Sequence, residues 1–76
     1  MKKKTEYTIR GFNVIVLDAE DAPDAIFRYE CEVYGDDPDV LLGYDCADSK
    51  TEVVVNALKG AEASQADITA ALDTMV

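Results

Sequence analysis

The sequence contains no histidine and no tryptophan, and only seven of its 76 residues are lysine or arginine. Without histidine, the chain lacks the side chain that most often acts as a general base near neutral pH. The shortage of lysine and arginine disfavours direct binding of nucleic acid, because phosphate contacts need a basic patch. We therefore look for function outside histidine chemistry and outside DNA or RNA binding.

Long apolar runs are also missing. The longest uninterrupted apolar stretch covers residues 14–17, whereas a membrane-spanning helix needs about 20 residues. Lys2, Lys3 and Lys4 resemble the basic start of a signal peptide, but no apolar segment follows them. We therefore expect a cytoplasmic protein whose residues 1–5 are flexible.

Only two cysteines are present, Cys31 and Cys46, and they form no CxxC motif. A zinc site would need both cysteines and two carboxylates, which is an unusual ligand set. We expect two small buried apolar side chains, and a disulfide stays open if the two lie on adjacent strands. An Asp-rich turn at 36–39 lacks the later ligands of an EF-hand loop. No metal and no cofactor are predicted.

Size and motifs limit the function further. A chain of this length forms one domain, residues 1–76, with a modest core and no deep cleft. Ser49 and Ser64 fit helix caps better than nucleophiles, and no phosphate-binding or hydrolase motif occurs. We expect a protein that is not an enzyme, and a homodimer would be one way to bury more surface.

The first two thirds of the chain predict strands. Residues 7–10 and 12–17 flank Gly11, which predicts a tight turn or a bulge. Acids and Pro23 predict a loop over residues 18–24. Residues 25–34 alternate clearly, so that Phe27, Tyr29, Cys31 and Val33 face the core. After a turn at 35–39, residues 40–46 predict a fourth strand.

The last third predicts two helices. Ser49 and Glu52 have the spacing of a capping box. The β-branched run at 53–55 favours a strand locally, so a fifth strand remains the alternative, but the cap favours a helix that ends near Gly60. Ser64 and Asp67 cap the second helix. Its apolar stripe consists of Ile68, Ala71, Leu72 and Met75.

These elements predict an α+β fold: a four-stranded antiparallel meander sheet followed by two C-terminal helices packed on one face. The other sheet face then stays open to solvent. Within residues 25–34, alternation places Glu30 and Glu32 on that open face.

The carboxylates are concentrated in the middle of the chain. Eleven lie between residues 18 and 48, with Arg28 as the only base among them, although the whole chain has a net charge of −9. Such a concentration repels itself, and it suits either a solvated face or a surface for a cationic partner. The candidate partner-binding residues are Glu20, Asp21, Asp24, Glu30, Glu32, Tyr34, Asp36, Asp37 and Asp39.

The spacing of these acids suggests how they could bind a basic partner. Alternate residues of a strand, such as Glu30 and Glu32, lie about 6.6–6.8 Å apart on one face, which is comparable to the spacing of successive phosphates. A row of this kind would attract a basic groove, and Tyr34 could add an aromatic anchor. The predicted partner is a basic protein surface; no nucleic acid or membrane is expected to bind directly.

In size, charge and order of elements, the chain resembles small acidic inhibitors encoded by phages, namely DNA mimics and type I anti-CRISPR proteins. The segment Asp48-Ser49-Lys50-Thr51-Glu52, which opens the first predicted helix after four strands, carries the likeness in layout. The resemblance implies a blocker of a bacterial defence complex, such as a CRISPR surveillance complex, that occludes DNA in the host cytoplasm.

A second resemblance gives the alternative function. Extended segments followed by Asp-Ser-x-x-Glu and an amphipathic helix also resemble HicB-type antitoxin domains. That resemblance implies a protein-interaction module that sequesters a small basic toxin. A homo-oligomeric subunit is the other alternative, with contacts through a sheet edge or the helix surface.

Overall fold

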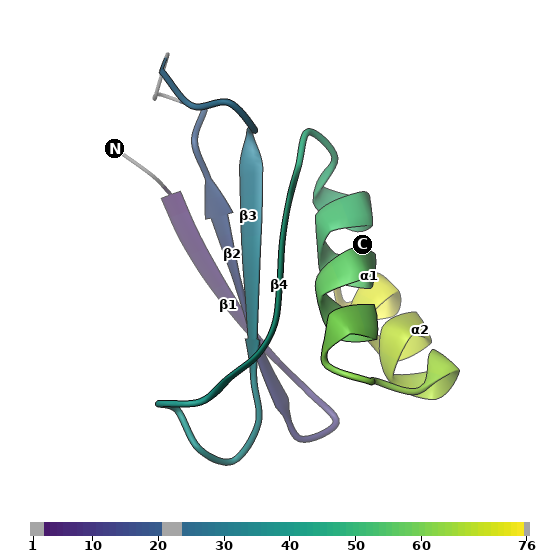
Figure 1. Cartoon of the computed structure of the whole chain (residues 1–76). Helices are drawn as coiled ribbons and strands as arrows, with labels where there is room; N and C mark the ends of the chain where they lie inside the picture. Colours follow the sequence, from purple (N-terminus) through teal and green to yellow (C-terminus); the bar gives the residue numbers. More distant parts are fainter. Residues whose placement is uncertain (1–2, 21–23, 76) are drawn as a thin grey trace.

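The computed structural model describes residues 3–20 and 24–75 (Figure 1). The chain forms β1 (Lys3–Ile9), β2 (Phe12–Asp18), β3 (Tyr29–Tyr34), β4 (Leu41–Ala47), α1 (Lys50–Gly60) and α2 (Gln65–Met75). The strands form one antiparallel sheet in the order β1-β2-β3-β4, and both helices cover the same face. The predicted α+β fold, a four-stranded antiparallel meander followed by two C-terminal helices, is confirmed.

The first hairpin turns at Arg10 and Gly11, whose φ angles are both positive (46° and 88°). A two-residue loop with positive φ at both positions matches the right-handed twist of the flanking strands, which explains the glycine. Pairing extends from Ile9 opposite Phe12 to Lys3 opposite Asp18. Residues 3–5, which we expected to be flexible, are thus part of a paired strand; residues 1 and 2 lie outside the described residues.

The core lies between the sheet and the helices. Val14 and Val16 of β2 stand opposite Val33 and Cys31 of β3, and all four side chains are buried. Tyr29 is half-buried against the same core. The predicted inward face of β3 is therefore confirmed from Tyr29 onward, and Glu30 and Glu32 point to the open face.

The start of β3 differs from the prediction. The strand begins at Tyr29, not at residue 25, and Phe27 is 45% exposed. Residues 25–28 close the loop between β2 and β3 instead: Ala19 N–H donates to the Arg28 carbonyl (2.8 Å), and Arg28 N–H donates to Asp48 Oδ1 (3.2 Å). The expectation that Phe27 belongs to the core was wrong, because this segment has no strand partner to hold it under the helices.

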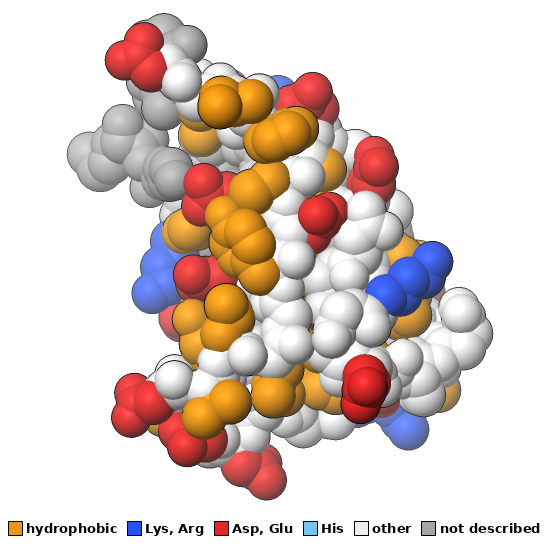
Figure 2. Space-filling view, viewed as in Figure 1, with side chains coloured by type: hydrophobic (Ala, Val, Ile, Leu, Met, Phe, Trp, Pro, Cys, Tyr) orange, Lys and Arg blue, Asp and Glu red, His pale blue; other side chains and the backbone are white. Residues whose placement is uncertain are grey.

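In β4, two of the positions that face the helices hold the small residues glycine and alanine. Gly43 and Ala47 are buried, and α1 crosses so close to Gly43 that a Cβ there would fall on the Ala57 carbonyl oxygen. Cys46 lies on the opposite face and is only half-buried, so the expectation of two buried cysteines was wrong for Cys46. Larger apolar side chains of β4 face solvent, and Figure 2 shows apolar side chains, in orange, gathered along this side of the molecule.

Helix α1 begins as predicted. The Ser49 hydroxyl accepts a hydrogen bond from the Glu52 backbone N–H (3.3 Å). Val53 and Val54 are completely buried against the sheet. Their burial outweighs the small helix penalty of β-branched residues, which is only a few tenths of a kcal/mol each, so the helix prevails over the fifth strand.

The end of α1 uses a residue that sequence reasoning did not single out. Gly60 is the last helical residue, but the left-handed residue is Glu62, with φ 60°. Ala63 N–H donates to the Leu58 carbonyl and Glu62 N–H to the Lys59 carbonyl, both at 3.0 Å. This is the Schellman arrangement, in which glycine is the preferred residue at the left-handed position.

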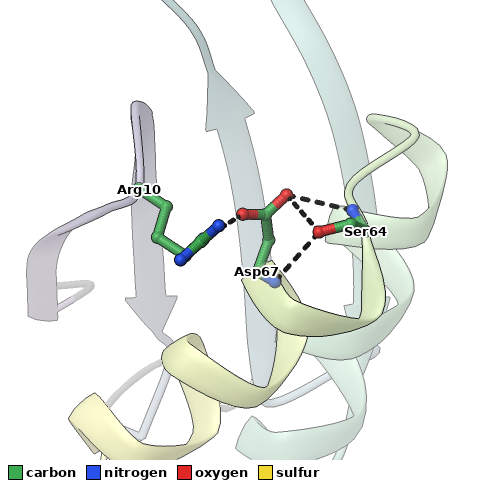
Figure 3. A network of polar contacts seen from close by, with 3 residues as sticks. All are labelled: Arg10, Ser64 and Asp67. Carbon is green, nitrogen blue, oxygen red and sulfur yellow. Dashed lines mark hydrogen bonds and ion pairs between the residues drawn. The ribbon is translucent and has the colours of Figure 1, made fainter.

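Helix α2 is capped as predicted and is also tied to the first hairpin (Figure 3). The Ser64 hydroxyl accepts from Asp67 N–H (3.2 Å), and Ser64 N–H donates to Asp67 Oδ2 (3.0 Å). Arg10 Nε donates to the other carboxylate oxygen of Asp67 at 2.7 Å. Ile68 and Ala71 of the predicted stripe are buried, so the network orients α2 against the core.

The close crossing at Gly43 predicts that Gly43→Ala unfolds the domain. The added Cβ would overlap backbone atoms, including Ala61 N at 2.9 Å, and backbone cannot move aside as a flexible side chain can. We expect a loss of about 3 kcal/mol, at the upper end of the usual cost of overpacking and comparable to what a core of this size supplies. Urea denaturation followed by circular dichroism measures it. Gly60→Ala is the control, since its Cβ would meet nothing closer than 3.8 Å. If both variants unfold at the same urea concentration, α1 does not approach Gly43 as closely as described.

The Schellman turn predicts that Glu62→Gly stabilises the protein. Glycine removes the steric cost of a left-handed residue, and we expect a net gain of about 0.5–1 kcal/mol after its own entropic cost. Calorimetry should show a rise in Tm of about 4–8 °C per kcal/mol. Glu62→Ala removes the same charge but keeps the positive φ, so an equal rise in that variant would argue against the conformational explanation.

The Asp67 network predicts a pH dependence. The backbone N–H of Ser64, then Arg10 and the Ser64 hydroxyl, hold the pKa of the Asp67 carboxyl below its usual value. A lowered folded-state pKa stabilises the fold above the unfolded pKa, about 4, and this contribution disappears as the pH falls through the folded value. The free energy of unfolding of Asp67→Asn should therefore fall less than that of the parent between neutral pH and pH of about 3. Asp73→Asn, an exposed site on the same helix, should behave like the parent.

Candidate protein-binding surface

The open face of the sheet carries one row of side chains that crosses all four strands. Strand register places Glu6, Ile15, Glu32 and Tyr44 side by side in that order. The row therefore has an apolar centre between two carboxylates and an aromatic ring at the β4 edge. This order suits a long side chain with an aliphatic stem and a cationic end.

A groove of about 470 Å³ lies over the part of this row formed by Glu6, Ile15 and Glu32. It is lined mainly by β1, β2 and β3, and its walls include Glu6, Asn13, Ile15, Glu32 and Tyr34. Glu6 pairs with Lys4 at 3.3 Å, whereas no described lysine or arginine lies within 4 Å of Glu32. Within the described ranges, Glu32 is thus the carboxylate of the groove that is available to a cation from outside.

The pKa values of two side chains in β3 and β4 are raised, in part by the carboxylates of β3. The hydrogen bond with Cys46, burial and the nearby Glu30 and Glu32 carboxylates raise the pKa of Tyr44 to about 12. Burial, with Glu32 and Asp45 adding to it, raises the pKa of the Cys31 thiol to about 12. Both shifts keep the neutral form at physiological pH, so Cys31 is a poor nucleophile and Tyr44 presents an uncharged ring.

Among the residues that the structure describes, none is a buried polar or charged side chain. No group of three or more potential metal ligands occurs in the same part of the chain. The arrangement on the open face suits binding.

The acids proposed from the sequence lie at both ends of β3 and between them. Glu20 and Asp24 are exposed in the loop before β3, and Glu20 lies 3.9 Å from Arg28. Asp36, Asp37 and Asp39 are exposed in the turn after β3, where Asp37 Oδ1 accepts from Asp39 N–H (2.9 Å). Asp21 lies outside the described residues.

Three of the proposed residues lie in β3 itself. Glu30, Glu32 and Tyr34 alternate along the strand and project from the open face, each half-buried. The structure therefore places the described candidate acids in the loop before β3, in β3 itself and in the turn after it. Their role in binding remains a prediction.

An apolar stripe beside these acids was not foreseen. Its members are the exposed large apolar side chains, which we call the β4 stripe: Ile26 (88% exposed), Phe27, Val40, Leu41 (49%), Leu42 and Tyr44 (49%). Figure 2 shows apolar side chains running along this side of the molecule, with acidic side chains beside them and at both ends. Exposed apolar patches rimmed by polar groups commonly mark interaction sites.

One signal in the sequence could have revealed the stripe. Val40, Leu41 and Leu42 are consecutive, and neighbouring strand residues point to opposite faces, so the helices cannot cover all three. The register between β3 and β4 also shifts between Val33 and Tyr34, because Tyr34 pairs with Leu41 and Val33 with Gly43. This shift places Leu42 outside the regular ladder.

The two edges of the sheet differ. Within residues 3–20 and 24–75, β4 pairs only with β3, so one side of its backbone has no partner strand. The other edge, β1, begins with Lys3 and Lys4, contacts α2, and contributes no side chain to the set of exposed large apolar residues. Charged side chains at a strand edge discourage pairing, so β4 is the receptive edge.

Comparison with known proteins gives no family to which the chain can be assigned: no family model, curated protein or solved structure matches it. Neither described helix has the length and apolar character needed to cross a membrane. The surface must therefore be interpreted from its own geometry.

Proposed function

We propose that this protein is a non-catalytic inhibitor that binds a cationic, nucleic-acid-binding surface of another protein and blocks access of DNA to it. The observation that carries the proposal is the β4 stripe with carboxylates at both ends and along its β3 side. Apolar contact supplies affinity, and complementary charge supplies rapid and selective association.

The partner follows from this chemistry. A surface that binds nucleic acid presents lysine and arginine, which would face Glu32 in the groove and the exposed acids of the two connecting segments. Together with the resemblance to type I anti-CRISPR proteins, this favours a bacterial CRISPR surveillance complex as the target. The protein would then be encoded by a phage and act in the host cytoplasm.

A second candidate is an interaction module, antitoxin-like or homo-oligomeric, whose main contact is the sheet edge. Among the described residues, β4 has no partner strand on its outer side and carries exposed apolar side chains, which favours this candidate. The two candidates differ in their response to salt: an electrostatic partner is weakened strongly by added salt, whereas an apolar contact is not.

The proposal predicts that reversing two surface acids abolishes inhibition while the fold survives. Glu32→Lys combined with Asp36→Lys should weaken the block of DNA binding by a type I surveillance complex at least tenfold, or about 1.4 kcal/mol, because lysines would then face lysines. DNA binding by the complex, titrated with the protein at low and high salt, measures this.

The matched control reverses two acids elsewhere. Glu62→Lys combined with Asp73→Lys changes the net charge equally, but both residues are exposed on the helical side. This variant should inhibit as the parent does. If both double variants lose inhibition equally, only overall charge matters; if neither loses it, the acidic surface is not the binding site.

A further inference from the structure

We infer that β4 is the docking edge for an extended, basic segment of the partner, which adds to the sheet as a fifth strand. This inference rests on the proposed function and specifies how the partner binds. An unpaired strand edge offers a row of backbone donors and acceptors to a peptide, while alternate side chains give specificity.

The chemistry of β4 favours such pairing. Residues 41–47 contain no lysine, arginine or proline, the residues that commonly protect an edge. The one charged residue, Asp45, accepts a hydrogen bond from Asn56 of α1 (3.1 Å) and so lies on the helix-covered face. The register shift is confined to the beginning of the strand, which leaves Gly43 to Ala47 in regular pairing with β3.

The flanking charges favour a basic occupant. Strand register places Tyr44 next to Glu32 and Cys46 next to Glu30 on the open face. A residue of an added strand opposite Tyr44 would lie about 10 Å, or two strand spacings, from the Glu32 backbone. Arginine can cross that distance over the neutral Tyr44 ring, where cation–π attraction adds to the ion pair.

The same charges disfavour a second copy of this chain as the occupant. Antiparallel pairing of β4 with itself about Tyr44 would place Leu41 opposite Ala47 of the other copy. The acidic turn before β4 would then lie beside the Asp48 end of the partner strand. Like charges would meet at both ends of the interface, in a chain whose net charge is already −9.

A peptide experiment tests the inference with the full chain. The probe is a seven-residue peptide, the length of β4, that alternates arginine with valine. Two matched peptides accompany it: one with alternate backbone nitrogens methylated, and one with glutamate in place of arginine. Amide NMR shifts and hydrogen exchange locate binding, and titration at low salt gives each affinity.

The expected result is that the arginine peptide binds, shifts the amides of residues 41–47 and protects them from exchange. Backbone methylation should weaken binding at least about tenfold through the loss of strand hydrogen bonds. Leu42→Lys, at a 41% exposed position, should weaken binding similarly. Thr69→Lys, exposed on α2, should not.

Other outcomes separate the two proposals. If the methylated peptide binds as tightly as its parent, or if only amides lining the groove shift, strand addition is overturned while charge-selective binding stands. If the glutamate peptide binds equally, or if no basic peptide binds, the proposed function fails as well. Sedimentation showing a dimer that Leu42→Lys dissociates would reassign the edge to a second copy and overturn the basic occupant.

Discussion

The close crossing of α1 over β4 at Gly43 is the constraint from which the candidate surface follows. The helix backbone occupies the space where a side chain at residue 43 would lie, so only glycine fits at that position on the helix-covered face of β4. The larger apolar side chains next to it, Leu42 and Tyr44, must project from the other face. The crossing of α1 over Gly43 completes the core, and the neighbouring apolar side chains of the β4 stripe stay in solvent.

Much of the fold could be predicted because its signals are local. The cap at Ser49, the capping box at Ser64 and the inward face of β3 depend on residue spacing within one element, and the structure confirms them. The order of four strands and two helices follows from such local patterns together with short connections.

What could not be predicted depends on contacts between distant segments. Phe27 alternates correctly with Tyr29, yet it lies in a loop without a strand partner, where the neighbouring Arg28 N–H donates to the distant Asp48. The orientation of Val40 to Leu42 depends on the register shift against β3, which no local pattern contains. The acids of the candidate site were found by counting charges. The apolar run at 40–42 indicates that some apolar side chains stay exposed, but their place on the molecule depends on how β4 pairs with β3.

The difference between the two sheet edges would limit edge-to-edge assembly of copies of this chain. The β1 edge carries lysines and contacts α2, whereas the β4 edge carries exposed apolar side chains. A sheet with two receptive edges can join copies of itself into a fibre, whereas a sheet with one cannot, because each copy offers only one contact. Under the proposed strand addition, one copy of this acidic chain would therefore serve one partner segment.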